Sequence, residues 1–346
     1  MSIINPGNLP QLTDIVNRTF FMTHENYPYV MRNSPLVKVM PMAKNTGLVT
    51  RYAEIIDVNQ FASIVDPGAQ IPSAKFQYGY EKDLFQYKVA SRLEITVEDR
   101  EAAKDYAQTI GNMIKQFSEQ PANRVELDLT HRLTFAFVTS YVSLEGKTID
   151  TTCGDGLALA STAHTLTGSS TTYSTIITGN PEAAKGSIEG ALKQFIENSY
   201  DNFGVRVVVP ADVIFCAPDP NTENTIDELL HATADVQSAN AGTFNVFGTG
   251  GQWRLRRFTV PRLNTTANGG TDTNKSKMWG LASSKNAGIY FSELQAPTVE
   301  SPKSGSNGED INTLNWIWTG YSIYGIAVPG ARWVRISSGT GANLSS

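Results

Sequence analysis

The sequence is poor in the residues that build disulfide frameworks and metal centres. Its 346 residues include 2 cysteines and 4 histidines. Cys153 and Cys216 lie far apart in the chain, so neither a disulfide framework nor a cysteine metal site is predicted. No two histidines have the spacing that puts two ligands on one helical face. The histidines are His24, His131, His164 and His231. We therefore expect no metal site, no cofactor and synthesis in a reducing cytoplasm.

Charge is also sparse, at 18% of residues, and the formal net charge is −5. The densest basic group, Arg254, Arg256 and Arg257, alternates with Trp253 and Leu255 as in a strand with one wet face. A structural role is therefore favoured, with a contact to another subunit or to DNA left open. The basic footprint of a sequence-specific DNA-binding protein is absent. A weakly acidic protein can still enclose DNA, because like charges repel over a Debye length of roughly 8 Å.

Long apolar runs are missing too. No stretch approaches the ~18 to 20 residues of a membrane-spanning helix, and residues 1–10 lack the basic and apolar segments of a secretory signal. We expect a protein that is neither exported by a signal peptide nor inserted in a membrane.

Catalytic patterns are equally scarce. His164 would need a placed nucleophile to act as a hydrolase base, and the chain has no Gly-x-Ser-x-Gly elbow. The run 248–251 has the glycine content of a phosphate cradle, but no Lys-Ser/Thr and no helix pattern follow, so a turn is predicted. The run 307–310 lacks the ligand spacing of a calcium loop. We predict a protein that is not an enzyme, with no catalytic, cofactor-binding or metal-binding residues.

The first hundred residues predict an arm and a hairpin. Prolines break residues 1–45, which favours an extended arm carrying exposed aromatic side chains. Apolar residues alternate near 50–58 and again over 85–95, which predicts two strands around a turn-rich middle at Asp66-Pro67-Gly68. An isolated two-stranded hairpin is marginal in water, so we expect it to lie on a neighbouring subunit.

A long helix should follow. Thr96 is the predicted N-cap. Glu98, Asp99 and Glu101 then fall in the first turn, where complementing the helix dipole explains them better than acid/base chemistry does. Helical periodicity continues for about 40 residues, a rod of roughly 60 Å, and Pro121 either kinks one helix or starts a second.

The second half predicts an α+β unit. Asn180-Pro181-Glu182 is typical of a helix start, with Gly204 closing that helix, and a second helix is expected behind Asp219-Pro220. Short strands are predicted at 205–209, 213–216, 253–260, 278–282 and 287–291. A Pro/Ser/Gly-rich stretch at 297–308 precedes terminal strands, between 316 and 336, that should return to the first core.

Several local motifs occur in order along the chain. They are Asp155-Gly156-x-x-Leu159-x-x-x-x-His164, Asn180 before a helix, Gly204-x-x-Val207-x-Val209-Pro210 ahead of Phe215-x-x-Pro218, and Tyr324-Gly325 leading to Ile336. Together with the arm, hairpin, long helix, α+β unit and returning strands, this order resembles the major capsid proteins of tailed bacteriophages.

The resemblance implies the α+β Hong Kong 97-type phage capsid fold. Its expected parts are an N-terminal arm at 1–45, an extended loop hairpin at 46–95, a peripheral domain with the spine helix at 96–180, an axial domain at 181–294, and C-terminal strands at 295–346 that rejoin the peripheral domain. Some relatives crosslink loop lysines to a neighbour's asparagine. Lys75 and Lys82 lie in the loop, but no crosslink is predicted from this sequence.

The resemblance also implies a function. The chain should self-assemble into pentamers and hexamers of an icosahedral head that encloses double-stranded DNA, as a structural protein of the virion capsid assembled in the host cytoplasm. Implied partners are further copies of the chain, a portal, scaffolding or decoration proteins, and DNA packaged without sequence specificity, with no membrane. Three alternatives stay open: an encapsulin-like compartment, a hydrolase that uses His164, and a tail or fibre protein.

Overall fold

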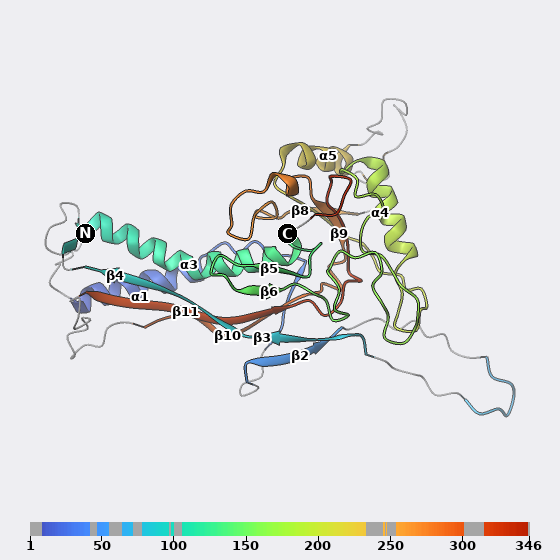
Figure 1. Ribbon diagram of the computed structural model, residues 1–346, viewed down its shortest axis with the longest axis horizontal. Coiled ribbons are helices and arrows are strands. Elements are labelled where there is room, and N and C mark those ends of the chain that lie inside the picture. Colours follow the sequence, from blue (N-terminus) through green and yellow to red (C-terminus); the bar gives the residue numbers. More distant parts are fainter. Residues whose placement is uncertain are drawn as a thin grey trace.

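The computed structural model describes residues 9–41, 47–54, 64–71, 78–96, 98–99, 106–232, 245, 247, 254–300 and 315–344. These residues form an elongated molecule in which long strands and helices occupy one end and a compact α+β unit the other (Figure 1). Two four-stranded sheets organise the two ends. The predicted α+β class is confirmed.

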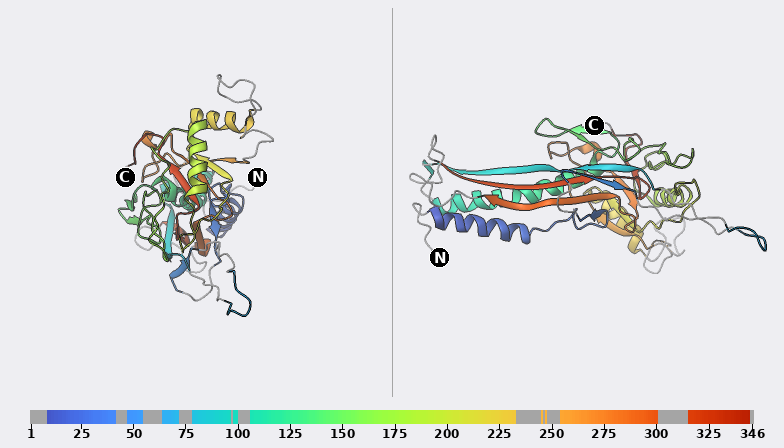
Figure 2. Two further views of the ribbon diagram at one scale, coloured as in Figure 1. Left: turned by 90° about the vertical axis from the view of Figure 1, so that its right-hand side faces the viewer. Right: turned by 90° about the horizontal axis from the view of Figure 1, so that it is seen from below.

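The first sheet is long and has one face covered by helices. Its strands, in spatial order, are β1 (Val37–Val39), β10 (Ile289–Glu300), β11 (Trp316–Ala327) and β4 (Tyr87–Ile95). α1 (Leu9–Glu25) and α3 (Tyr106–Thr134) lie on one face, and the view from below looks onto the strands of the opposite face (Figure 2). Buried Trp318, Leu93 and Ile95 fill the space between this sheet and the helices.

The long helix α3 runs from Tyr106 to Thr134, inside the region where the sequence predicts it. Thr96 Oγ1 accepts a hydrogen bond from the backbone N–H of Asp99 at 3.1 Å, as an N-cap does. Residues 100–105, which separate Asp99 from α3, lie outside the described residues, so the start of the long helix at Thr96 stays a prediction. The helix α3 is continuous through Pro121 and ends at Thr134, a little earlier than predicted. Apolar side chains are buried at helical spacing along its length, and from Asp128 to Thr134 the helix is buried all round. The apolar residues are Ile110, Ile114, Phe117, Val125, Leu129 and Leu133.

The prediction of an extended arm is wrong for the first described residues. They form the 17-residue helix α1, whose Leu12, Val16 and Phe20 are buried against α3. The prolines bracket this helix rather than break it. Pro10 occupies the first turn, where a backbone N–H has no intrahelical partner, and Pro28 comes after the helix has ended.

The second sheet forms the core of the compact unit. Its strands, in spatial order, are β12 (Val334–Ser337), β9 (Trp279–Ala282), β7 (Val213–Cys216) and β8 (Arg256–Thr259). The helices α4 (Lys185–Glu197) and α5 (Pro220–His231) pack beside it. Asp219 caps α5 by accepting from the Thr222 N–H at 3.0 Å, so that predicted helix start is confirmed.

The C-terminal strands divide between the two sheets. The prediction that they all rejoin the first core is correct for β11 but wrong for β12, which pairs with β9 in the second sheet. The strand β10 is longer than predicted, since it runs from Ile289 through Pro297 to Glu300 and joins the first sheet. It therefore crosses the boundary expected at 294/295.

Two further local predictions are wrong. The helix expected from Asn180 starts at Lys185 and ends at Glu197, well before Gly204, because the carbonyl of Pro181 instead accepts hydrogen bonds from Trp279 Nε1 and Ser337 Oγ. No strand forms at 205–209, where the backbone makes a single bridge at Arg206 and the Val208 side chain is 76% exposed.

The predicted hairpin is present in part. β2 (Val49–Ala53) pairs antiparallel with β3 (Glu81–Phe85), but after Gln86 the chain continues as β4 and pairs with β11 instead. The predicted turn forms where the Ala69 N–H donates to the Asp66 carbonyl at 3.0 Å, in the segment 64–71, which lies far from the body of the molecule (Figure 1). Predictions that fall outside the described residues concern Ile56, Val58, Lys75, Glu101, Trp253 and the runs 248–251 and 307–310.

Two short strands complete the fold. β5 (Ser140–Val142) and β6 (Thr148–Asp150) pair antiparallel after the end of α3. They form a small hairpin that lies beside the first residues of β4, and it lines a groove together with them.

Candidate functional site

Polar side chains fasten the projecting hairpin where it leaves the body of the molecule. We call Glu54, Tyr80 and Lys82 the hairpin root. Lys82 Nζ donates to Asp150 Oδ2 at 2.7 Å and to Thr152 Oγ1 at 2.6 Å. The hydroxyl groups of Tyr80 and Thr165 hydrogen-bond at 2.7 Å. The root thus holds β2 and β3 against the loop that follows β6.

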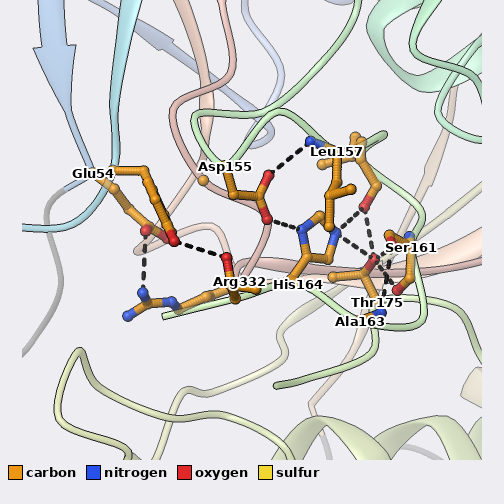
Figure 3. A network of polar contacts seen from close by, with 12 residues as sticks. Glu54, Asp155, Leu157, Ser161, Ala163, His164, Thr175 and Arg332 are labelled. Carbon is orange, nitrogen blue, oxygen red and sulfur yellow. Dashed lines mark hydrogen bonds and ion pairs between the residues drawn. The ribbon is translucent and has the colours of Figure 1, made fainter. Parts of the chain in front are cut away.

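The third root residue, Glu54, is paired inside the protein. Its Oε2 lies 3.5 Å from Arg332 Nη2, and the two side chains are only 11% and 8% exposed (Figure 3). Burial raises the pKa of the Glu54 carboxyl above its ordinary value of 4.5, although the charge of Arg332 opposes that rise. A Cβ at Gly330 would lie 2.0 Å from the Glu54 carboxyl group, so only glycine allows this approach.

Arg332 also ties this pair to the compact unit. Its Nη1 donates to the carbonyl of Tyr200 at 3.2 Å, and its Nη2 donates to Asn202 Oδ1 at 2.7 Å. Nε of Arg332 is buried without a hydrogen-bond partner among the described residues. The guanidinium therefore joins the hairpin root to the loop after α4, two parts that are distant in sequence.

The loop beside the root is organised around His164. This residue is fully buried, and its Nδ1 donates to Asp155 Oδ2 at 2.6 Å (Figure 3). Its Nε2 lies 3.2 Å from the Leu159 carbonyl oxygen and 3.1 Å from Thr175 Oγ1. The ring also stacks on Tyr173, with a centroid distance of 5.2 Å. Both ring nitrogens are therefore engaged by atoms of the same loop.

This geometry does not support the hydrolase hypothesis for His164. A general base needs a ring nitrogen within reach of a substrate proton, and neither nitrogen faces solvent. The nearby hydroxyl of Thr175 is itself buried and donates to the Leu159 carbonyl at 2.7 Å. The Asp155–His164 pair instead fixes the shape of a loop on which the hairpin rests.

We expect the ionisation of Asp155 to make part of the folding stability depend on pH. Burial raises the pKa of its carboxyl, but the hydrogen bond from His164, the His164 charge and the N–H groups of Leu157 and Thr165 lower it, and the net pKa is below 3.8. Because a depressed carboxyl pKa stabilises the fold at pH values above the unfolded-state pKa, that contribution is lost as the pH falls through the folded-state pKa.

The corresponding variant is Asp155→Asn. Near neutral pH its free energy of unfolding should be about 1–3 kcal/mol lower than that of the wild type, and this difference should shrink below about pH 4. Urea denaturation over this pH range measures it, with the exposed Asp14→Asn as control. A difference independent of pH would contradict the role given to the ionised Asp155 carboxylate.

Two of the three arginines singled out in the sequence, Arg256 and Arg257, form ion pairs with acidic side chains. Arg256 Nη2 lies 3.1 Å from Asp212 Oδ2. Arg257 contacts Glu223 and Asp227, both at 2.8 Å. These pairs fix β8 to its surroundings and favour the structural role over phosphate binding.

A second buried histidine, His131 on the long helix α3, is also structural. His131 is buried between Tyr141 and Thr265, and burial, together with the positive charge of Lys275, lowers its pKa to about 3. Across the part of the chain that the structure describes, no group of three or more His, Cys, Asp or Glu residues is arranged to hold a metal ion. Within the same part, no helix is long and apolar enough to cross a membrane.

Apolar side chains are exposed at one end of the β2–β3 ribbon. Val49 is paired with Phe85 across the ribbon, and Leu48 precedes them. These three side chains are 42%, 63% and 59% exposed, respectively. In the projecting part, Ile64, Ile71 and Tyr78 are exposed as well. We call Leu48, Val49 and Phe85 the ribbon face. Sequence reasoning anticipated exposed apolar residues in the arm, but the clearest cluster lies on this ribbon.

The fold and these surfaces describe a structural protein with an exposed apolar projection. A family model described as phage capsid protein matches residues 80–336, most of the chain. The chain belongs to this phage capsid protein family. It is accordingly a structural component of the virion capsid and contributes to the capsid shell, and it is not an enzyme.

Solved structures of phage capsids are similar to this chain. The cyanophage Pam1 capsid asymmetric unit is 12% identical with a TM-score of 0.49, over 90% of this chain and 92% of that chain. The asymmetric unit of the bacteriophage PhiM1 mature capsid is 10% identical with a TM-score of 0.48, over 90% and 87%. A structure titled Gordonia phage Cozz is 12% identical with a TM-score of 0.46, over 89% and 85%. A search of curated protein sequences gave no match.

Proposed function

We propose that this chain is the major capsid protein that assembles into pentamers and hexamers of an icosahedral head around double-stranded DNA. The observation that carries the proposal is the ribbon face with the projecting segment beyond it, because these large apolar side chains have no cover within the described chain. Single exposed apolar residues are ordinary, but several large ones gathered at one end of a strand ribbon, with more in the projecting segment, are typical of interaction sites.

The energetics of such a contact are adequate for a shell. Burial of apolar surface stabilises by about 25 cal/mol per Å², so a few hundred Å² per contact contributes several kcal/mol. Closed symmetry multiplies this contribution around the particle. Contacts of modest strength therefore suffice when every subunit makes several of them.

The domain roles follow from the same proposal. The hairpin at 46–95 is the extended loop that lies on a neighbour, and α3 is the spine of the peripheral domain. The unit that begins near 181 is the axial domain around the local symmetry axes. Because β10 joins the long sheet and β12 the compact one, we assign β10 to the peripheral domain and β12 to the axial domain.

The partners proposed are further copies of this chain, a portal, and scaffolding or decoration proteins. The shell encloses DNA without binding it tightly, since Arg256 and Arg257 are already paired with acidic side chains and the net charge is −5. Few phosphate contacts are therefore expected, and the affinity for DNA should depend only weakly on salt concentration.

The direct test is assembly of the purified protein. Wild type should form closed shells in negative-stain microscopy, whereas Phe85→Asp should reduce closed shells by at least about tenfold, the effect of losing roughly 1.4 kcal/mol per contact. Phe85→Leu keeps an apolar contact and should still assemble. Because Phe85 is 63% exposed, the unfolding of the unassembled Asp variant should match that of wild type.

Other outcomes would contradict the proposal. A wild-type chain that stays monomeric at all concentrations would overturn it. Shells that enclose protein cargo instead of DNA would favour the encapsulin-like alternative, and tubes would favour a tail protein. Normal shells from Phe85→Asp would remove the ribbon face from the assembly contacts.

A further inference from the structure

Among the described residues, the strand β4 is an unpaired edge of the long sheet. It is the last strand in the spatial order, and all nine of its residues pair with β11 on one side. On its other side no described strand pairs with it, although the β5–β6 hairpin lies next to residues 87–90, and in the right panel of Figure 2 β4 borders the sheet. A free edge of this length presents a row of unpaired backbone N–H and C=O groups, which is a template for another strand.

The two faces of β4 differ in character. Leu93 and Ile95 are buried on the side that faces α3, and Tyr87 on that side donates its hydroxyl to Asp128 of α3. Lys88 and Arg92 alternate with them on the exposed side. An added strand must match both faces at once, which restricts its register strongly.

We infer that β4 pairs antiparallel with β4 of a second copy of this chain, about a two-fold axis at Ser91. In this register, opposite residues fall into four kinds of pair. They are Tyr87 with Ile95, Lys88 with Glu94, Val89 with Leu93, and Ala90 with Arg92. Apolar side chains meet apolar ones on the α3 side, and each lysine meets a glutamate on the open side. The strand is thus complementary to itself, as a two-fold interface requires.

Neighbouring registers lose this charge complementarity. An axis at Ala90 would set Lys88 opposite Arg92, and an axis at Arg92 would set two Arg92 side chains face to face. Like charges directly opposite each other destabilise a strand pair. Ser91 Oγ is buried and has no hydrogen-bond partner among the described residues. With the axis at Ser91, the hydroxyl group of the opposing Ser91 becomes that partner.

A groove next to β4 has room for the end of the second strand. It measures about 300 Å³ and lies between residues 87–90 and the β5–β6 hairpin. Two exposed lysines, Lys88 and Lys147, line it. Its arginine, Arg124, is already paired with Asp128 and Glu145. The groove therefore offers two cations to Glu94 of the partner subunit.

This inference rests on the proposed self-assembly and adds a named contact to it. The pairing joins the long sheets of two subunits into one sheet across the axis. The contact is separate from the ribbon face, which lies on the β2–β3 ribbon, so each is tested by its own variants.

The first test places a cysteine on the axis. Ser91→Cys shells, mildly oxidised, should give a disulfide-linked band at twice the 37.7 kDa chain mass on a non-reducing gel. Val39→Cys on β1, at the other edge of the same sheet, is the matched control and should give no such band. The native Cys153 and Cys216 are buried and should contribute none.

The second test exchanges the charges. Lys88→Glu and Glu94→Lys should each lower the yield of shells several-fold, and the double variant should restore it. Within one chain the two residues are roughly 20 Å apart along the strand, so only a contact between copies explains rescue. Thermal unfolding of each unassembled variant controls for folding, since Glu94 also contacts Arg92 and Asn315.

The outcomes separate the two proposals. Shells without a Ser91→Cys dimer, together with single charge variants that assemble like wild type, would overturn the β4 pairing and leave the capsid function intact. Absence of wild-type shells would overturn the proposed function. In that case a Ser91→Cys dimer in solution would still support the strand pairing, and its absence would overturn that too.

Discussion

Replacing Arg332 with Met is expected to lower the free energy of unfolding by about 3–5 kcal/mol, because Glu54 would stay buried without its counter-charge. The two side chains are 8% and 11% exposed, so solvent can replace little of what is lost. The Tyr200 carbonyl and the Asn202 amide oxygen would lose their donors as well. Urea denaturation of the unassembled protein measures the effect.

The Arg332→Met variant should also acquire a characteristic pH dependence. Burial holds the pKa of Glu54 above 4.5 in the folded state, and without Arg332 that pKa rises further. A carboxyl with a raised folded-state pKa binds its proton more tightly when folded, so stability falls as the pH rises through the interval between the two pKa values. The variant should therefore be more stable relative to wild type at about pH 5 than at about pH 8.

The double variant Glu54→Gln/Arg332→Met supplies the control. Removing the buried charge together with its partner should recover part of the lost stability and abolish the added pH dependence. Equal stability of the single and double variants at both pH values would show that Arg332 acts through its hydrogen bonds to Tyr200 and Asn202 alone.

Replacing Glu126 with Ala should be nearly as severe, with a loss of about 2–4 kcal/mol. Its carboxylate accepts three consecutive backbone N–H groups, from Val30 at 3.1 Å, Met31 at 2.7 Å and Arg32 at 3.0 Å. Met31 is fully buried, so its N–H would be left without an acceptor in the described chain. The segment after α1 should then loosen from the long helix.

Two measurements test this prediction. Urea denaturation should give the global loss of stability. Hydrogen exchange in Glu126→Ala should speed up more at residues 30–32 than in the strands of the first sheet. Glu126→Gln keeps one acceptor oxygen and should be intermediate, and the exposed Gln120→Ala on the same helix should be neutral. Unchanged exchange at 30–32 would contradict the role given to the carboxylate.

The sequence predicted elements well wherever a local pattern was strong. The apolar spacing on α3, the Asp219 cap of α5 and the four buried residues of β7 were each visible in a few consecutive residues. Local patterns failed where a side chain had two roles. Pro10 was taken to break a helix that it starts, and Pro181 was taken to start a helix although its carbonyl is bound to Trp279.

Strand partners were beyond local patterns. The alternation over 85–95 predicted a strand, but not that β4 would leave β3 and pair with β11, more than two hundred residues later. The same holds for β12, whose four buried residues fit either sheet by composition. Hydrogen bonds between strands are identical for all sequences, so the choice depends on which apolar faces can pack together.

At the hairpin root and the loop beside it, local contacts were likewise easier to predict from the sequence than contacts between distant residues. His164 and Asp155 share a short loop, and the sequence offers no nucleophile motif for that histidine to activate. The pairing of Glu54 with Arg332 carried no such signal, since nearly the whole chain separates the two residues.

The α+β class, the long helix and the lack of familiar catalytic motifs could be predicted from the sequence alone, because they depend on composition and on spacing over a few turns. Which strands share a sheet, which charges are buried together at the hairpin root, and which edge of the long sheet has no further strand among the described residues could be learned from the folded chain alone. Those features arise from contacts between distant segments, whose free energy exists only once the chain has folded.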